Sequence, residues 1–133
     1  MINLTIPGIP IPWKSHAGYG RRSYNPRFKE KQFAQYYIKE QWEEFAIGII
    51  TGAVAVHFLF HMPIPTSTSK KKKVEMLDGT IPHTKRPDCT NMQKFYEDCL
   101  KGIVILDDSL VKSVSSDKIY SEEPRTTILL EIL

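Results

Sequence analysis

The sequence predicts a small domain of the mixed α/β (α+β) class, and two observations carry this prediction. Segments with alternating apolar residues, typical of strands, are interleaved with segments whose apolar residues recur at helical spacing. Their order is strand, helix, strand, long loop, helix and two closing strands, without internal repeats. A chain of 133 residues can also enclose one real hydrophobic core. We therefore expect a single domain over residues 1–133, with a mixed sheet and two main helices packed on it.

Residues 2–13 are predicted to form a strand that ends in an extended arm. Ile2, Leu4 and Ile6 alternate with polar neighbours, as strand residues do. Three prolines then follow, and proline cannot donate to a central ladder, so this segment belongs at a sheet edge or in an arm. The next segment, Lys14–Arg27, contains two glycines and a basic-aromatic cluster, which indicates a mobile loop.

The first helix is predicted from about Pro26 to Ile47, with an apolar stripe that includes Phe33, Tyr37 and Phe45. The strand that follows, Gly52–His61, is rich in β-branched and aromatic residues. Both of its faces are largely apolar, which predicts a central strand covered on both sides.

Residues 66–85 are polar and strongly basic, and four consecutive lysines lie in their middle. We expect a long flexible loop here, because loops of this length are usually functional or disordered. A helix is then predicted from Asp88, as N-cap, to about Lys101, with Gly102 as the C-cap. The segments Leu110–Ile119 and Thr126–Ile132 alternate as two closing strands.

Composition excludes several classes of protein. With 41% hydrophobic and 25% charged residues, the chain resembles ordinary soluble globular proteins. It has no apolar run of about 18 residues, so we expect no membrane span, and its N-terminus does not have the pattern of a secretory signal. Cys89 and Cys99 would lie about 15 Å apart on one helix, too far for a disulfide. We therefore expect a cytoplasmic protein with reduced thiols.

The charge distribution is uneven. Residues 1–87 hold 13 Lys/Arg and 6 Asp/Glu, a net +7, whereas residues 88–133 hold 5 Lys/Arg and 9 Asp/Glu, a net −4. A basic half joined to an acidic half suits a protein that attracts a polyanion and concentrates carboxylates at one place. The alternative is that these are solvated surface charges without a common role.

Four carboxylates and one lysine are candidates for a single hydrolytic magnesium site: Asp88, Asp98, Asp107, Asp108 and Lys94. A hard cation prefers oxygen ligands and retains waters, so two or three carboxylates suffice. A nearby lysine can stabilise charge that develops on a phosphate. The helix separates Asp88 from Asp98, so only a close approach of the Asp107–Asp108 segment would unite the set. The simpler alternative is that Asp88 is only an N-cap and that the acidic pair is only a polar turn.

The order and spacing of these residues resemble the RusA family of Holliday junction resolvases. The family pattern is similar to Lys-Pro-Asp-x-Asp-Asn-x-x-Lys, then Asp-Ala-Leu, a short gap, and Asp-Asp before a strand that carries a lysine. The matching residues here are Lys85, Pro87, Asp88, Asn91, Lys94, Asp98, Leu100, Asp107, Asp108 and Lys118. The opening Pro7-Gly-Ile-Pro10 with Lys14 is also similar, so the resemblance spans nearly the whole chain.

The resemblance implies a homodimeric, Mg²⁺-dependent endonuclease that cuts four-way DNA junctions in recombination and repair, of a kind common in phages and prophages, with Mn²⁺ as an alternative cation. It implies that Asp88, Lys94 and Asp108 are catalytic and that Asp88, Asp107 and Asp108 bind the metal. Thr90, Asn91 and Asp98 would line the site. The implied substrate places the protein with the nucleoid DNA of the cytoplasm.

Thr90 departs from the family pattern, because it replaces the second aspartate of the Asp-x-Asp pair. A hydroxyl is a weaker ligand than a carboxylate for a hard cation. Two hypotheses therefore stay open. In the first, the protein is a cutting enzyme in which Asp107 or Asp98 supplies the negative charge that the metal site lacks at Thr90. In the second, it is a catalytically weak or inactive protein that only binds branched DNA.

Several basic and aromatic residues are candidates for DNA contacts. Basic side chains position a protein on phosphates without specifying sequence, and aromatic rings stack on unpaired bases. A lysine run is also common in a merely solvated loop. The basic candidates are Lys14, Arg21, Arg22, Lys70, Lys71, Lys72, Lys73, Lys85, Arg86 and Lys118, and the aromatic ones are Tyr19 and Tyr24.

Overall fold

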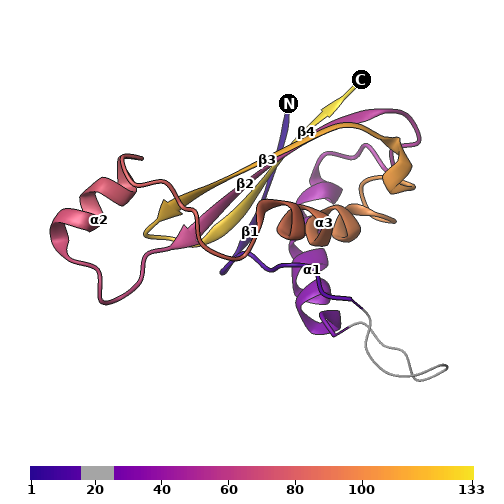
Figure 1. Ribbon diagram of the computed structural model, residues 1–133. Helices are drawn as coiled ribbons and strands as arrows, with labels where there is room; N and C mark the ends of the chain where they lie inside the picture. Colours follow the sequence, from indigo (N-terminus) through magenta and orange to yellow (C-terminus); the bar gives the residue numbers. More distant parts are fainter. Residues whose placement is uncertain (16–25) are drawn as a thin grey trace.

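The computed structural model describes residues 1–15 and 26–133. Its centre is one mixed sheet in the order β1-β4-β2-β3 (Figure 1). The outer strand β1 pairs antiparallel with β4, β4 pairs antiparallel with β2, and β2 pairs parallel with β3. The strand bounds are β1 Ile2–Pro7, β2 Val54–Pro63, β3 Val111–Ser121 and β4 Arg125–Ile132. The predicted α/β class with a mixed sheet is therefore confirmed.

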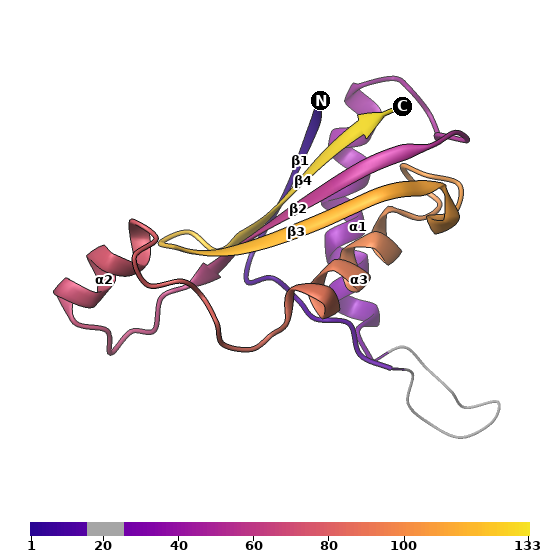
Figure 2. The same ribbon diagram turned by 45° about the horizontal axis from the view of Figure 1, so that its top comes forward.

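Two helices cover one face of this sheet, α1 (Phe28–Glu44) and α3 (Cys89–Leu100), as Figures 1 and 2 show. The core lies between them and the sheet, where Phe58 of β2 and Ile128 of β4 are fully buried register partners. Burial of each such side chain contributes about 1.5–3 kcal/mol, which is what holds the layers together.

The apolar stripe predicted for the first helix was wrong in its position. The buried residues of α1 are Ala34, Ile38 and Trp42, whereas Phe33 and Phe45 are largely exposed. The buried set follows one i, i+4, i+8 row, which is the row that faces the sheet. Tyr37, on the neighbouring row, packs partly against the core.

Strand β2 is central, as predicted, but only one of its faces is buried along its whole length, and on the other face only His61 is buried. Val56, Phe58 and Phe60 are buried beneath the helices, whereas His57 and Leu59 on the opposite face are only partly buried. This open face carries polar contacts, which include a 2.6 Å hydrogen bond between His57 Nδ1 and Ser115 Oγ. The prediction of two covered faces was therefore wrong.

The basic segment 66–85, predicted to be a flexible loop, contains a helix, α2 (Lys70–Leu77). The Ser69 hydroxyl caps it by accepting a hydrogen bond from the Lys72 N–H. Helix α2 has no buried residue and lies beyond the end of the sheet, away from α1 and α3 (Figure 2). It has no apolar stripe of the kind by which helices are recognised in a sequence.

The segment between α3 and β3 carries the acidic pair. Val104 and Ile105 are fully buried, and the short 3₁₀ helix η2 (Asp108–Leu110) follows them and leads into β3. Both cysteines are free, with Cys99 buried in the core. Within the described ranges, no helix has the length and apolar character to cross a membrane.

Candidate active site

Asp88 occupies the N-cap position of α3, as predicted, but its carboxylate does not cap the helix. The Asp88 backbone is extended, and its carbonyl accepts the N–H of Met92, whereas its side chain makes no capping hydrogen bond. The side chain is exposed at the positive end of the helix dipole. An accessible carboxylate there can serve as a ligand for a hard cation.

The loop that leads into Asp88 is tied to the sheet by Lys118. The ammonium group of Lys118, on β3, donates to the carbonyl oxygens of Lys85 and Pro87, the second at 3.1 Å. Beside it, the His83 ring packs on the Tyr120 ring with centroids 4.7 Å apart. Burial, with the positive charges of Lys118 and Lys85, lowers the pKa of His83. Lys118, a predicted DNA contact, therefore has a structural task in the free protein.

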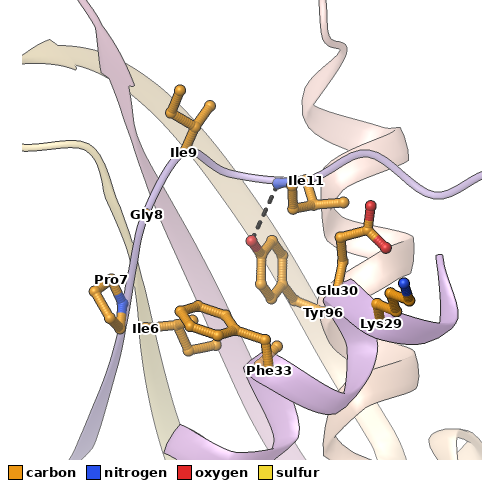
Figure 3. Close-up of a pocket in the computed structure, with 10 residues that line it drawn as sticks. Ile6, Pro7, Gly8, Ile9, Ile11, Lys29, Glu30, Phe33 and Tyr96 are labelled. Atoms are coloured by element: carbon orange, nitrogen blue, oxygen red, sulfur yellow. Dashed lines mark hydrogen bonds between the residues drawn. The ribbon is translucent and has the colours of Figure 1, made fainter.

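The N-terminal arm, residues 8–15, lies along α3. The Ile11 N–H donates to the Tyr96 hydroxyl at 3.1 Å (Figure 3), and the Trp13 N–H donates to the Asn91 carbonyl at 2.9 Å. Burial raises the pKa of Tyr96, so this phenol stays neutral. The ammonium group of Lys94 lies 3.5 Å from the centroid of the Trp13 ring.

A cleft of about 550 Å³ lies between this arm and the start of α3. Its walls are mostly apolar, and its polar lining comes from Asp88, Asn91 and Arg86. Thr90 is exposed in the first turn of α3. Asn91, predicted to line the site, therefore shares this cleft with Asp88. Lys94 does not line the cleft but contacts Trp13, which does.

The second group of carboxylates lies beyond the other end of α3. Asp107 accepts the Ser109 N–H at 3.0 Å and pairs with Lys101 at 3.3 Å. The hydrogen bonds from Ser109 and then Lys101 lower the pKa of Asp107 to about 2. Asp108 is exposed, and its charge adds to burial in raising the pKa of Glu97.

Glu97 is a candidate that sequence reasoning missed. It lies one turn beyond Lys94 on α3, and what marks it is a pKa raised by burial and by the nearby charge of Asp108. Asp98, predicted to line the site, instead pairs with Lys31 of α1 at 3.0 Å and joins the two helices.

One chain does not bring the predicted metal ligands together. Helix α3 has 12 residues and spans about 18 Å, so it separates Asp88 from the Asp107–Asp108 pair. Among residues 1–15 and 26–133, no group of three His, Cys, Asp or Glu side chains is placed to hold a metal ion. The arrangement is instead two half-sites, Asp88 with Asn91 and Lys94 at one end, and Asp108 with Glu97 at the other.

The described residues that were predicted to contact DNA lie on several separate elements. Lys85 and Arg86 lie in the loop before Asp88, Lys14 is exposed on the arm, and the lysine run forms the first half of α2. Lys73 pairs with Glu122 at 3.0 Å. The other candidates, Arg21, Arg22, Tyr19 and Tyr24, lie outside the described residues.

Comparison with known proteins decides the family. The family model described as "Endodeoxyribonuclease RusA" matches residues 12–131, nearly the whole chain. The chain belongs to the RusA family. The matched span includes both half-sites, and membership in a family of endodeoxyribonucleases supports an endonuclease activity. A relative in Bacillus subtilis (strain 168), described as "Uncharacterized protein YqaN", is 32% identical over 134 residues, covering 97% of this chain and 94% of its own length.

Proposed function

We propose that this protein is a Mg²⁺-dependent endonuclease that resolves four-way (Holliday) DNA junctions by paired phosphodiester hydrolysis in recombination and repair. The observation that carries the proposal is the exposed Asp88 carboxylate, which makes no capping bond and lies beside Asn91 and Lys94 within the RusA match. An accessible carboxylate and a lysine beside one cleft are groups that metal-assisted phosphodiester hydrolysis requires.

The donor set suits a hard divalent cation. Asp88 and Asp108 are exposed carboxylates whose oxygens match the preference of Mg²⁺, and Mn²⁺ accepts the same ligands. A bound cation would supply Lewis-acid polarisation of the phosphate and an activated water. Asp107 is ionised but already paired with Lys101, so we expect it to contribute less to metal binding than Asp88 and Asp108 do. Lys94 would stabilise the negative charge that develops on the phosphate oxygens.

We propose a two-fold dimer as the active form, because paired incisions in a junction need two equivalent sites. The separation of the half-sites supports this proposal. In a two-fold arrangement of antiparallel α3 helices, the Asp88 end of one helix lies beside the Asp108 end of the other. Each complete metal site would then combine Asp88 of one protomer with Asp108 of the partner subunit.

The alternative function is a RusA-like protein that holds branched DNA without cutting it. Thr90 favours this alternative, because a hydroxyl in the first turn of α3 stands where the family pattern has an aspartate. In that case metal affinity would be too low for turnover, while the basic residues would still bind the junction.

The deciding experiment measures Mg²⁺-dependent nicking of a synthetic four-way junction by the wild type, Asp88→Asn and Thr90→Asp. Asp117→Asn is the matched control, because Asp117 is an exposed carboxylate on the open face of the sheet. We expect the wild type and the control to nick. Asp88→Asn should lose at least about 100-fold in rate, as when one charge-stabilising group is removed from an active site.

Thr90→Asp should raise activity or lower the Mg²⁺ concentration needed. Binding of the junction by the wild type without cleavage at any metal concentration would contradict the enzyme proposal and leave the alternative. Absence of salt-sensitive DNA binding would contradict both, since several phosphate contacts give a steep salt dependence.

A further inference from the structure

Lys94 has an aromatic partner where an exposed lysine usually has water. Its ammonium group lies 3.5 Å from the centroid of the Trp13 ring. Among the described residues, no carboxylate lies within ion-pair distance of that ammonium group. The Trp13 contact is thus the interaction that directs this side chain, and it joins residues 81 positions apart in the sequence, on the arm and on α3.

Trp13 is itself held in place by the backbone of the arm. Its N–H donates to the Asn91 carbonyl at 2.9 Å, and two residues earlier the Ile11 N–H donates to the buried Tyr96 hydroxyl (Figure 3). Pro12 lies between these anchors and Pro10 precedes them, and both restrict the backbone of the arm, because each fixes its own φ. These anchors fix the backbone position from which the indole ring contacts Lys94, and Trp13 also lines the cleft that contains Asp88.

An aromatic partner on an anchored backbone matters because a lysine side chain is long and has many rotamers. An aromatic face attracts an ammonium group through its quadrupole, and tryptophan does so most strongly. Docking the ammonium group over Trp13 selects the rotamers that keep the charge against a residue that lines the Asp88 cleft. A positioned charge can stabilise a transition state without reorganising during the reaction.

We propose that Trp13 is a positioning residue for Lys94, so that the N-terminal arm sets the geometry of the catalytic cation. This inference rests on the proposed role of Lys94 in phosphodiester hydrolysis. Trp13 acts through Lys94 and not by stacking on a base of the DNA, and this distinction determines the test.

The test combines four variants in single-turnover cleavage of a four-way junction at saturating protein: Trp13→Leu, Trp13→Phe, Lys94→Met, and Trp13→Leu with Lys94→Met. We expect Trp13→Leu to lower the cleavage rate constant about tenfold while the junction Kd changes less than about twofold. Trp13→Phe, which keeps an aromatic face, should retain most of the rate. In the Lys94→Met background, Trp13→Leu should cause no further loss, because residues that act as a unit are not additive.

Two results would overturn the proposal and make Trp13 a DNA contact. One is that the rate losses of the two single variants multiply in the double variant. The other is that Trp13→Leu weakens junction binding in the Lys94→Met background. Full cleavage by Lys94→Met would instead overturn the proposed role of Lys94.

A readout independent of activity separates these failures. In the wild type, the ε-methylene protons of Lys94 should show an upfield NMR shift from the indole ring, and Trp13→Leu should abolish it. Lack of that shift in the wild type would contradict the positioning contact directly. Equal urea midpoints for Trp13→Leu and wild type serve as the folding control.

Discussion

Lys118 offers the sharpest test of how the candidate active site is built. Two interpretations of this residue compete, a DNA phosphate contact and a structural tie for the loop before Asp88. In the free protein its ammonium group donates to the carbonyl oxygens of Lys85 and Pro87. We predict that Lys118→Met destabilises the protein, because the loop loses its attachment to β3.

The magnitude follows from these two contacts. Hydrogen bonds from a charged donor contribute about 1.5–3 kcal/mol each when well shielded. The carbonyl of Lys85 is exposed and can be satisfied by water after the substitution, so its share is small. The contact with Pro87 is partly buried and keeps more of its value. We expect a total loss of about 2 kcal/mol in the free energy of unfolding.

The assay is urea denaturation, paired with junction binding over a range of salt concentrations. Lys112→Met is the matched control, since Lys112 is an exposed lysine on the same strand and should change stability by less than about 0.5 kcal/mol. A structural tie predicts a stability loss with an unchanged salt dependence of binding. If stability is unchanged and the slope of log binding constant against log salt concentration falls by about one, the structural tie is refuted and Lys118 is a phosphate contact.

Three further predictions concern the core and its titratable groups. Phe58→Ala should cost about 3–5 kcal/mol in urea denaturation, because Phe58 is fully buried between β2 and the helices; a loss below 1 kcal/mol would contradict this packing. Burial raises the pKa of Cys99 to about 12, so iodoacetamide should modify Cys89 first in the native protein. Equal rates of modification of the two cysteines would contradict this prediction. The pKa values of His61 and His83 are lowered, mainly by burial. The unfolded chain then binds protons more readily, so stability should fall as pH drops below about 6.5. Urea midpoints between pH 8 and 5.5 test this, and His61→Gln with His83→Gln should flatten the dependence.

The strands and the two main helices could be predicted because local patterns encode them. Alternation marks β1, β3 and β4, and the proline-limited strand at the start of the chain does lie at a sheet edge. The apolar stripe of α1 was misplaced because it was assigned to the large aromatic residues, whereas the small residue Ala34 is buried against the core. Helix α2 was missed because none of its residues is fully buried and it has no apolar stripe, and only Ser69 at its start and Gly79 after its end signal it locally.

The candidate site was predicted only where residues adjoin in sequence. Asp88, Asn91 and Lys94 lie within two turns of one helix, so their proximity follows from helical geometry. The contact of Lys94 with Trp13 and the effect of the Asp108 charge on Glu97 link separate elements, and no local pattern encodes them. Whether Asp107–Asp108 approaches Asp88 depends on how the chain packs after α3, and within one chain it does not.

The central claim is that each active site combines Asp88 of one protomer with Asp108 of the other, and a purified heterodimer tests it most directly. Asp88→Asn and Asp108→Asn chains carrying different affinity tags are co-expressed, and the mixed dimer is isolated through both tags. It should nick four-way junctions at about half the wild-type rate, because one of its two composite sites is intact. Each homodimeric variant should be inactive. An inactive heterodimer beside an active wild type would contradict the claim.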